Sequence, residues 1–205
     1  MIRVSKEGIL ALEKLDRTKL VNSLSGYKSA VLIGTQNQAG ANNLAIFSSV
    51  VHIGANPPLM GIVQRPASVE RHTYENIKAS GVFTINHVPI AFYEAAHQTS
   101  ARYPREISEF EACGFTPVFS ETISAPYVAE SPLRIGLKLE EEIEIKSNQT
   151  ILLIGSIQEL FVAHQLAENE NHIDLSSLNT LLVQGLDTYY KVEKMATLPY
   201  AKFAK

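Results

Sequence analysis

The sequence has little cysteine, no tryptophan and no long apolar run. Cys113 is the single cysteine among 205 residues, so no disulfide can form within the chain. No hydrophobic stretch approaches the ~20 residues of a membrane-spanning helix, and residues 1–10 carry charges where a secretory signal is continuously apolar. These absences favour a protein of the reducing cytoplasm, with no membrane partner, in which Cys113 is packed rather than reactive.

The sequence lacks the residues that are characteristic of several functional classes. The net charge of −3 and the pI near 6.1 give no field that would gather nucleic acid. No two of the six histidines lie within five residues of each other, so we expect no metal site. The sequence contains no G-x-G-x-x-G, no phosphate-binding loop ending in G-K-[ST] and no G-x-S-x-G elbow. We also find no set of acid, base and nucleophile, as expected if a cofactor supplies the chemistry.

Alternating hydrophobicity predicts long antiparallel strands. Apolar and charged residues alternate over Leu133–Ile145, with one interruption in the acidic cluster Glu140–Glu142, which we interpret as a solvated face. Ile151–Val162 returns as a second strand, with Gly155 as a candidate bulge. Ala30–Thr35 begins another predicted hairpin. This pattern favours a barrel or a sandwich over a doubly wound fold.

The length suits a single domain over residues 1–205. Lys6–Asn22 is either a short helix or an irregular arm, because its leucine spacing does not decide between them. An insertion around residues 90–126 has helical and loop character, with helices predicted over Ile90–Thr99 and Ser108–Gly114. Loops of this length commonly border a functional site.

The most informative stretch runs from Asn42 to Asn86 and is predicted as strand, Pro-Pro turn, strand, basic loop, helix and strand. Ser48 and Ser49 stand together in an apolar strand, so one must point inward or the strand must bulge. The helix is predicted to begin at Thr73, whose hydroxyl would cap its first turn, and to end at Gly81.

Arg65 and Arg71 come shortly before this helix. A helix N-terminus attracts anions, and two guanidinium groups beside it suit a phosphate of roughly −1.5 to −2 charge. Taken singly, each arginine could equally be a solvated surface residue. The sequence therefore predicts a candidate phosphate site.

The order and spacing of these residues resemble the flavin reductase family with the FMN-binding split barrel. The matching motifs are N-L-A-x-F-S-S at Asn43–Ser49, P-P-L at Pro57–Leu59, R-P at Arg65–Pro66, R-H-T-x-x-N-I at Arg71–Ile77, G-x-F-x-x-N at Gly81–Asn86, E-F-E-A-C-G-F-T-P at Glu109–Pro117, A-E-S-P at Ala129–Pro132 and G-L-D-x-Y-Y at Gly185–Tyr190. The likeness covers most of the chain.

The resemblance implies a mainly β fold, an antiparallel Greek-key split β-barrel with a few peripheral helices. It also implies that FMN binds at a homodimer interface. NADH or NADPH would reduce the flavin, which would pass electrons to a free flavin, a partner oxygenase or another acceptor. We expect the tail aromatics Tyr200 and Phe203 to pack on the neighbouring subunit.

The resemblance also implies the cofactor-binding residues. These are Asn43, Phe47, Ser48, Ser49, Gln64, Arg65, Arg71, Thr73 and Asn86. Main-chain groups of residues 47–49, with Asn43 nearby, would bind the polar edge of the isoalloxazine. Arg65, Arg71 and Thr73 would hold the phosphate, and Gln64 and Asn86 would line the site.

Three positions depart from the usual pattern of the family. Arg71 stands where lysine is common and keeps the charge. His72 replaces an acid, so the local electrostatic field differs from that of the family. Ile46 replaces a proline, so the approach of this strand to the site differs as well.

Two functions remain open. One is an NAD(P)H-dependent flavin oxidoreductase, and the other is a non-catalytic FMN-binding electron carrier fed by a protein donor. The sequence does not decide between NADH and NADPH, between FMN and FAD, or among electron acceptors.

Overall fold

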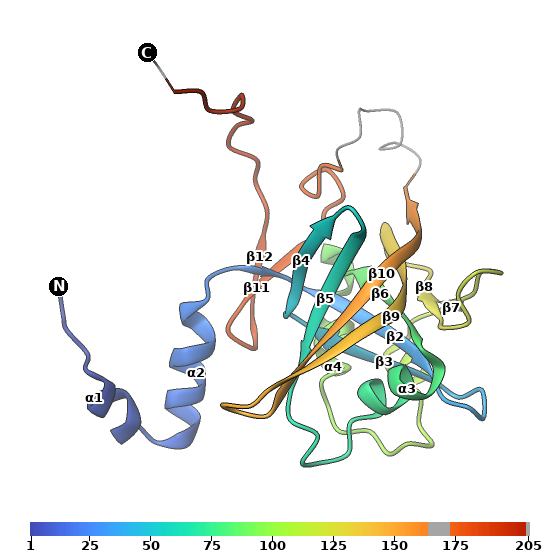
Figure 1. The fold of residues 1–205 in the computed structure, drawn as a ribbon, viewed down its shortest axis with the longest axis horizontal. Helices are drawn as coiled ribbons and strands as arrows, with labels where there is room; N and C mark the ends of the chain where they lie inside the picture. The colour runs from blue at the N-terminus through green and yellow to red at the C-terminus, as the bar shows by residue number, and fades with distance from the viewer. Residues whose placement is uncertain (164–172, 204–205) are drawn as a thin grey trace.

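The computed structural model describes residues 1–163 and 173–203, and strands predominate (Figure 1). The helices are α1 Lys6–Ala11, α2 Lys14–Leu24, α3 His72–Ser80, the 3-10 helix η1 Ile90–Phe92, α4 Tyr93–Gln98 and α5 Glu109–Cys113. The strands are β1 Lys28–Ser29, β2 Val31–Gln36, β3 Asn42–Phe47, β4 Val50–Ala55, β5 Pro58–Gln64, β6 Val82–His87, β7 Pro117–Val118, β8 Tyr127–Val128, β9 Leu133–Ile145, β10 Thr150–Val162, β11 Leu181–Gln184 and β12 Thr188–Lys191. His164 and His172 lie outside the described residues.

Seven strands form one antiparallel sheet in the order β3-β2-β6-β9-β10-β5-β4. β3 and β4 occupy its two opposite edges, yet only Ser48 and Ser49 separate them along the chain. The sheet must therefore curl until its edges approach each other, which makes it a barrel left unpaired between β3 and β4. The prediction of a mainly β, antiparallel barrel is confirmed. Smaller sheets join β1, β11 and β12, and β7 with β8.

The long hairpin of β9 and β10 has the bounds that the alternation predicted, within one residue. Its register shifts between Ile154, which faces Glu141, and Gly155, which faces Leu139. Glu140 therefore has no cross-strand partner, which is the geometry of a β-bulge. The bulge lies where the alternation of the sequence is interrupted, and Gly155 takes part in it as expected.

The bulge changes the surroundings of the acidic cluster. Glu142 is half-buried against α3, where the Tyr74 hydroxyl donates to its Oε1 at 2.8 Å and Lys78 pairs with it. Glu140 is exposed and accepts from the Ser156 hydroxyl at 2.6 Å. The interpretation of this cluster as one solvated face is wrong for Glu142, because the register shift turns it toward the helix.

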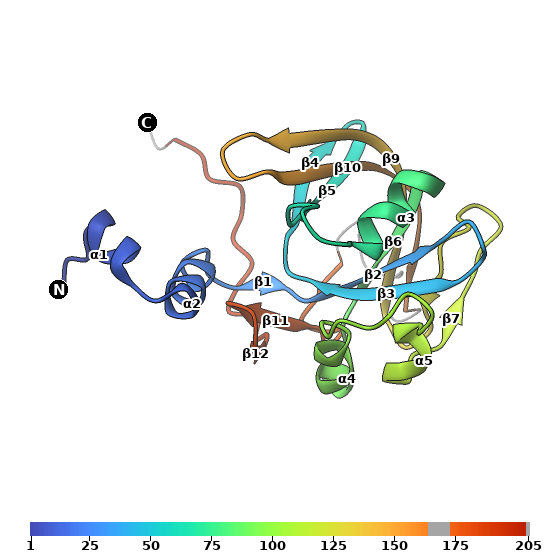
Figure 2. The same cartoon turned by 90° about the horizontal axis from the view of Figure 1, so that it is seen from below.

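Two of the three apolar clusters in the described residues lie on opposite faces of β2. The barrel interior is lined by alternate residues of its strands, among them Val31, Ile33, Ile62, Phe83, Leu137 and Leu153. The other face carries Leu32 and Leu44, which pack against Ala96 of α4 and Phe110 of α5. Figure 2 shows α3 on one side of β2 and β3, and α4 and α5 on the other. Cys113 packs at the second region, and its burial raises the pKa of the thiol.

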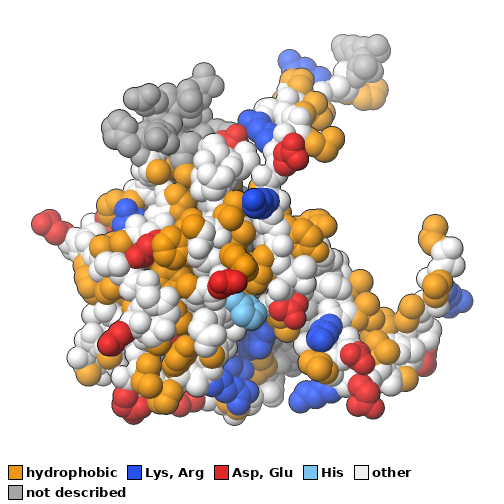
Figure 3. Space-filling view, turned by 180° about the vertical axis from the view of Figure 1, so that it is seen from behind, with side chains coloured by type: hydrophobic (Ala, Val, Ile, Leu, Met, Phe, Trp, Pro, Cys, Tyr) orange, Lys and Arg blue, Asp and Glu red, His pale blue; other side chains and the backbone are white. Residues whose placement is uncertain are grey.

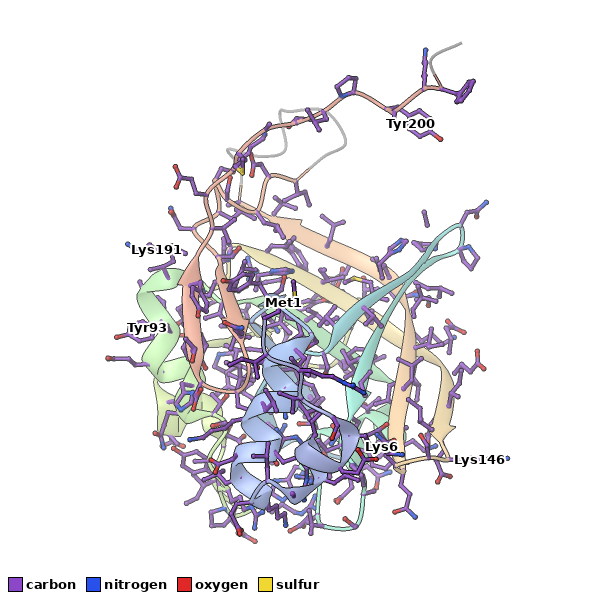
Figure 4. All side chains as sticks on the ribbon, turned by 90° about the vertical axis from the view of Figure 1, so that its left-hand side faces the viewer. Met1, Lys6, Tyr93, Lys146, Lys191 and Tyr200 are labelled. Carbon is purple, nitrogen blue, oxygen red and sulfur yellow. The ribbon has the colours of Figure 1, made fainter. Side chains whose placement is uncertain are left out.

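Both ends of the described chain stand away from the barrel. α1 and α2 form an arm without a single buried residue, so the N-terminal segment is helical rather than irregular. Residues 192–203 form a tail in which Tyr200 is 91% and Phe203 93% exposed. Figure 3 shows apolar side chains along both segments, and Figure 4 shows Tyr200 far out on the tail. Such surfaces mark places where another molecule packs.

Within residues 1–163 and 173–203, no helix is long and apolar enough to cross a membrane. In the same part of the chain, no three His, Cys, Asp or Glu side chains gather as a metal site would require. The segment between β6 and β8 contains η1, α4 and α5, as its helical spacing predicted. The single-domain organisation stays a prediction.

Candidate functional site

Ser48 and Ser49 form the serine passage, the two-residue connection between β3 and β4 at the two edges of the sheet. The Ser49 hydroxyl donates to the Val63 carbonyl at 2.8 Å, and the Val63 N–H donates to the Ser49 carbonyl at 3.2 Å. These bonds fasten the passage to β5. Phe47 packs against the interior cluster, while Ser48 is half-exposed. The predicted local break is therefore present as a two-residue connection that carries the chain from β3 at one edge of the sheet to β4 at the other, both strands running in the same sense.

A buried amide and hydroxyl cluster fixes the start of α3 on the sheet. Asn43 donates from Nδ2 to the Thr35 hydroxyl at 3.2 Å and to the Thr73 hydroxyl at 3.1 Å. Asn76 donates to the same Thr35 oxygen at 3.1 Å. Because these bonds join β2, β3 and α3, they determine where the first turn of the helix lies.

The prediction that α3 begins at Thr73 and is capped by its hydroxyl is wrong. The helix begins at His72, and the side chain of Arg71 at the cap position makes no capping bond, while the Glu75 carboxylate accepts from the Arg71 N–H at 3.0 Å. The Thr73 hydroxyl instead faces Asn43, a residue 30 positions away. The end of the helix at Gly81 is confirmed, with φ of 72°. The uncapped N–H groups make this helix start a favourable place for an anion.

Arg65 and Arg71 lie beside that helix start. Arg71 is half-buried, and its Nε donates weakly to the Pro66 carbonyl at 3.4 Å. Burial lowers the pKa of Arg71, and the positive charges of Arg65 and Arg102 lower it further. Among the described residues no carboxylate forms an ion pair with any of these three. The positive charge is therefore uncompensated within this part of the chain.

Gln64 carries an unsatisfied polar atom at the end of β5. The residue is 4% exposed and its Oε1 accepts no hydrogen bond, while its Nε2 reaches the Arg65 carbonyl at 3.4 Å. A buried acceptor without a donor is unfavourable by about 1–3 kcal/mol. A ligand that donates a hydrogen bond here would remove that penalty.

Asn86 lies on the other face of the sheet. It pairs with Leu32, whereas Asn43 pairs with Thr35, and an odd separation along β2 puts the two amides on opposite faces. Asn86 donates to the Leu32 carbonyl at 3.1 Å and accepts from the Val128 N–H at 3.0 Å. The structure therefore does not bring Asn86 together with the other candidate residues.

Sequence reasoning missed several residues around the site. Thr35 and Asn76 anchor α3, and Arg105 connects two segments at its start. Glu109 accepts from the Leu44 N–H at 3.0 Å, and its burial raises the pKa of the carboxyl. Each acts through a contact distant in sequence, so no local pattern reveals it.

The candidate residues differ in exposure: Asn43, Gln64, Thr73 and Asn86 are buried, Phe47, Ser48, Ser49 and Arg71 are half-buried, and Arg65 is exposed. A polar hollow of about 10 Å³ lies at the start of α3, bordered by Asn43, His72 and Asn76. That volume suits one water molecule. A groove of about 400 Å³ lies elsewhere, between α2 and the β11–β12 turn. A bound aromatic ligand would therefore need a further surface to cover it.

Comparison with known proteins establishes the family. The family model described as "Flavin reductase like domain" matches residues 24–186. This chain belongs to that flavin-binding family. It also resembles a solved candidate flavin reductase with a split barrel domain from Shewanella frigidimarina, with 49% identity, 98% of this chain and 100% of the other covered, and a TM-score of 0.94.

Two further relatives illustrate the range of the family. Nitrilotriacetate monooxygenase component B from Bacillus cereus is 26% identical, covers 97% of this chain and 98% of its own, and has a TM-score of 0.84. An uncharacterised protein of Halalkalibacterium halodurans is 34% identical over 152 residues, 71% of this chain and 72% of its own length. The split-barrel prediction is confirmed by these likenesses.

The site residues fit a flavin that carries a phosphate. The uncompensated guanidiniums and the uncapped α3 suit its phosphoryl end, and the orphaned Gln64 Oε1 suits a donor of the ligand. Thr73 fits less well than predicted, because its hydroxyl already binds Asn43.

Proposed function

We propose that the protein is a flavin-dependent oxidoreductase that binds FMN and uses NADH or NADPH to reduce it. The observation that carries the proposal is the arginine pair beside an uncapped helix, in a chain of the flavin reductase-like family. Bound flavin would supply hydride acceptance and electron transfer, so the protein needs no acid, base or nucleophile set of its own.

The residues divide into those that contact the flavin and those that position the contacts. Arg65, Arg71 and the first turn of α3 hold the phosphate. Main-chain groups of residues 47–49 bind the polar edge of the isoalloxazine, and the bonds between Ser49 and Val63 keep that edge in place. Asn43 and Thr73 act mainly by fixing the helix start, since their polar groups bind each other.

A second copy of the chain completes the site. Three features support a covering partner: the hollow at the start of α3 is too small for a flavin, the arm of α1 and α2 has no buried residue, and the aromatics of the tail are exposed. In a homodimer the tail would place Tyr200 and Phe203 on the neighbouring subunit. Burial of these rings and of the arm's leucines would stabilise the dimer.

The electrons would pass to a free flavin, an oxygenase or another acceptor. An oxygenase partner is supported by the similarity to a monooxygenase component B over nearly the full chain. The oxygenase would bind near the flavin edge, where the serine passage keeps the surface open.

Spectroscopy of the purified protein tests the function. We expect it to bind FMN, and we expect anaerobic addition of NADH or NADPH to bleach the visible band of the oxidised flavin rapidly. An oxidised spectrum that persists with both nucleotides but bleaches with a reduced protein donor would instead identify an electron carrier. A protein that fails to bind FMN contradicts both functions.

A further inference from the structure

Arg105 joins two distant segments at the start of α3. It lies in the loop between α4 and α5, and its Nε donates to Glu70 Oε1 at 3.1 Å. Its Nη2 pairs with both Glu70 and Glu75. Glu70 belongs to the loop before α3, and Glu75 belongs to the first turn of the helix. One guanidinium therefore connects the loop between α4 and α5 to the helix start, and Figure 1 shows both loops along the lower edge of the barrel.

The two glutamates lie beside the groups that would bind phosphate. Glu75 Oε1 accepts from the Arg71 N–H at 3.0 Å. Glu70 directly precedes Arg71 in the chain, and its Oε1 lies 3.4 Å from Nε2 of His72, the first residue of the helix. The N–H groups of a helix start attract a carboxylate as they attract a phosphate. Two negative charges therefore lie where an anionic ligand is expected.

Arg105 engages both of these carboxylates. Glu75 uses Oε1 for the Arg71 N–H and Oε2 for Arg105, so each of its oxygens has a partner. Glu70 Oε1 accepts from both Nε and Nη2 of Arg105. The Arg105 guanidinium lowers the pKa of the Glu70 carboxyl, and the Arg71 N–H and Arg105 together lower that of Glu75. The Arg71 guanidinium, by contrast, forms no ion pair within residues 1–163 and 173–203.

We propose that Arg105 is a positioning residue for the phosphate site. By holding Glu70 and Glu75, it keeps their carboxylates from pairing with Arg71, whose guanidinium stays free for the phosphoryl group of the ligand. This inference rests on the proposed function. Without Arg105, each acid becomes an intramolecular competitor of the phosphate, because Glu75 is already bonded to the main chain of Arg71 and Glu70 is the neighbouring residue.

Flavin fluorescence titrations test this role, with riboflavin as the ligand that lacks the phosphate. We expect Arg105→Gln to raise the Kd for FMN about fivefold, because one exposed ion pair between Arg71 and an acid must then be broken. The Kd for riboflavin should stay unchanged. Arg105→Lys, which keeps a positive charge, should lose less FMN affinity. The control Lys191→Gln removes one exposed charge at the end of β12 and should bind both ligands as the wild type does.

Removal of the two acids gives the most specific variant. Glu70→Gln and Glu75→Gln, added to Arg105→Gln, should restore the FMN affinity of the wild type, because a neutral amide does not compete for Arg71. An amide at position 75 can still accept from the Arg71 N–H. If Arg105 acted only by connecting the segments, this triple variant would stay as weak as Arg105→Gln, since that connection is still lost.

The same two acid substitutions with Arg105 intact keep the test independent of how well Arg105→Gln folds. This double variant should bind FMN at least as tightly as the wild type, and weaker binding would overturn the inference. Three other results would also overturn it: equal FMN affinity in wild type and Arg105→Gln, a parallel loss for FMN and riboflavin, or a triple variant that binds FMN no more tightly than Arg105→Gln.

Failure of the proposed function gives a different result, a wild type that binds no FMN. The same variants would then be titrated calorimetrically with inorganic phosphate, which the site should bind more weakly in Arg105→Gln than in the wild type. Equal phosphate affinity in the two proteins, or a wild type that binds no phosphate, would overturn the role of Arg105.

Discussion

Replacing Arg71 with alanine should weaken FMN binding while leaving the unliganded protein stable. The Arg71 Nε makes one long bond, to the Pro66 carbonyl, and the guanidinium has no ion pair among the described residues. Its removal therefore breaks little in the fold and relieves repulsion with Arg65 and Arg102. Loss of a charge-assisted bond to phosphate would reduce the binding free energy by roughly 1.5–3 kcal/mol, which raises the Kd about 10–150-fold.

Flavin fluorescence titrations measure this effect, with riboflavin as the matched ligand because it lacks the phosphate. Arg71→Ala should bind riboflavin as the wild type does and bind FMN more weakly. Lys191→Ala, remote on β12, controls for the change in net charge. Equal FMN affinity in variant and wild type would remove Arg71 from the site. A parallel loss for FMN and riboflavin, with a lower unfolding temperature, would show that Arg71 acts on the fold instead.

Three other changes test separate parts of the structure. Thr73→Val should lower the free energy of unfolding by about 1 kcal/mol, because it removes the acceptor of an Asn43 hydrogen bond. The control Thr73→Ser keeps that acceptor. Equal denaturant midpoints for the wild type and both variants would refute the stabilising role of the Thr73 hydroxyl. Burial lowers the pKa of His87 to about 4 from an ordinary 6.5. Between pH 4 and 6.5 the imidazole of His87 is therefore protonated in the unfolded chain and neutral in the folded protein. The free energy of unfolding should fall as the pH drops from 6.5 to 4, by up to about 3 kcal/mol. His87→Gln should flatten this part of the profile, and an unchanged slope would contradict the assignment. Truncation after Thr197 should weaken the dimer in sedimentation experiments, since it removes two exposed tail aromatics; an unaltered dimer would count against their packing on a neighbouring subunit.

The parts of the fold that depend on local pattern could be predicted from the sequence. Alternation located β9 and β10 and, through its single interruption, the bulge beside Gly155. The adjacent serines located the break between β3 and β4. The sequence alone does not show that this break joins the two edges of a seven-stranded sheet, because strand order depends on pairings distant in sequence.

In the candidate site, too, local features could be predicted from the sequence, whereas contacts between distant residues could not. Arg65 and Arg71 lie beside the helix start as predicted, because they precede it directly in the chain. Thr73 was misassigned because a helix-capping pattern is local, whereas its partner Asn43 lies on another strand. Asn86 was grouped with the site by its place in a motif, although strand register puts it on the opposite face. Arg105 was missed because its partners, Glu70 and Glu75, lie at least 30 positions earlier in the chain.

The most direct measurement is the crystal structure of the protein crystallised with FMN. We expect the phosphate to lie between the guanidiniums of Arg65 and Arg71 at the start of α3, with the polar edge of the isoalloxazine on the main chain of residues 47–49. A flavin bound elsewhere, with both guanidiniums directed into bulk water, would contradict this account.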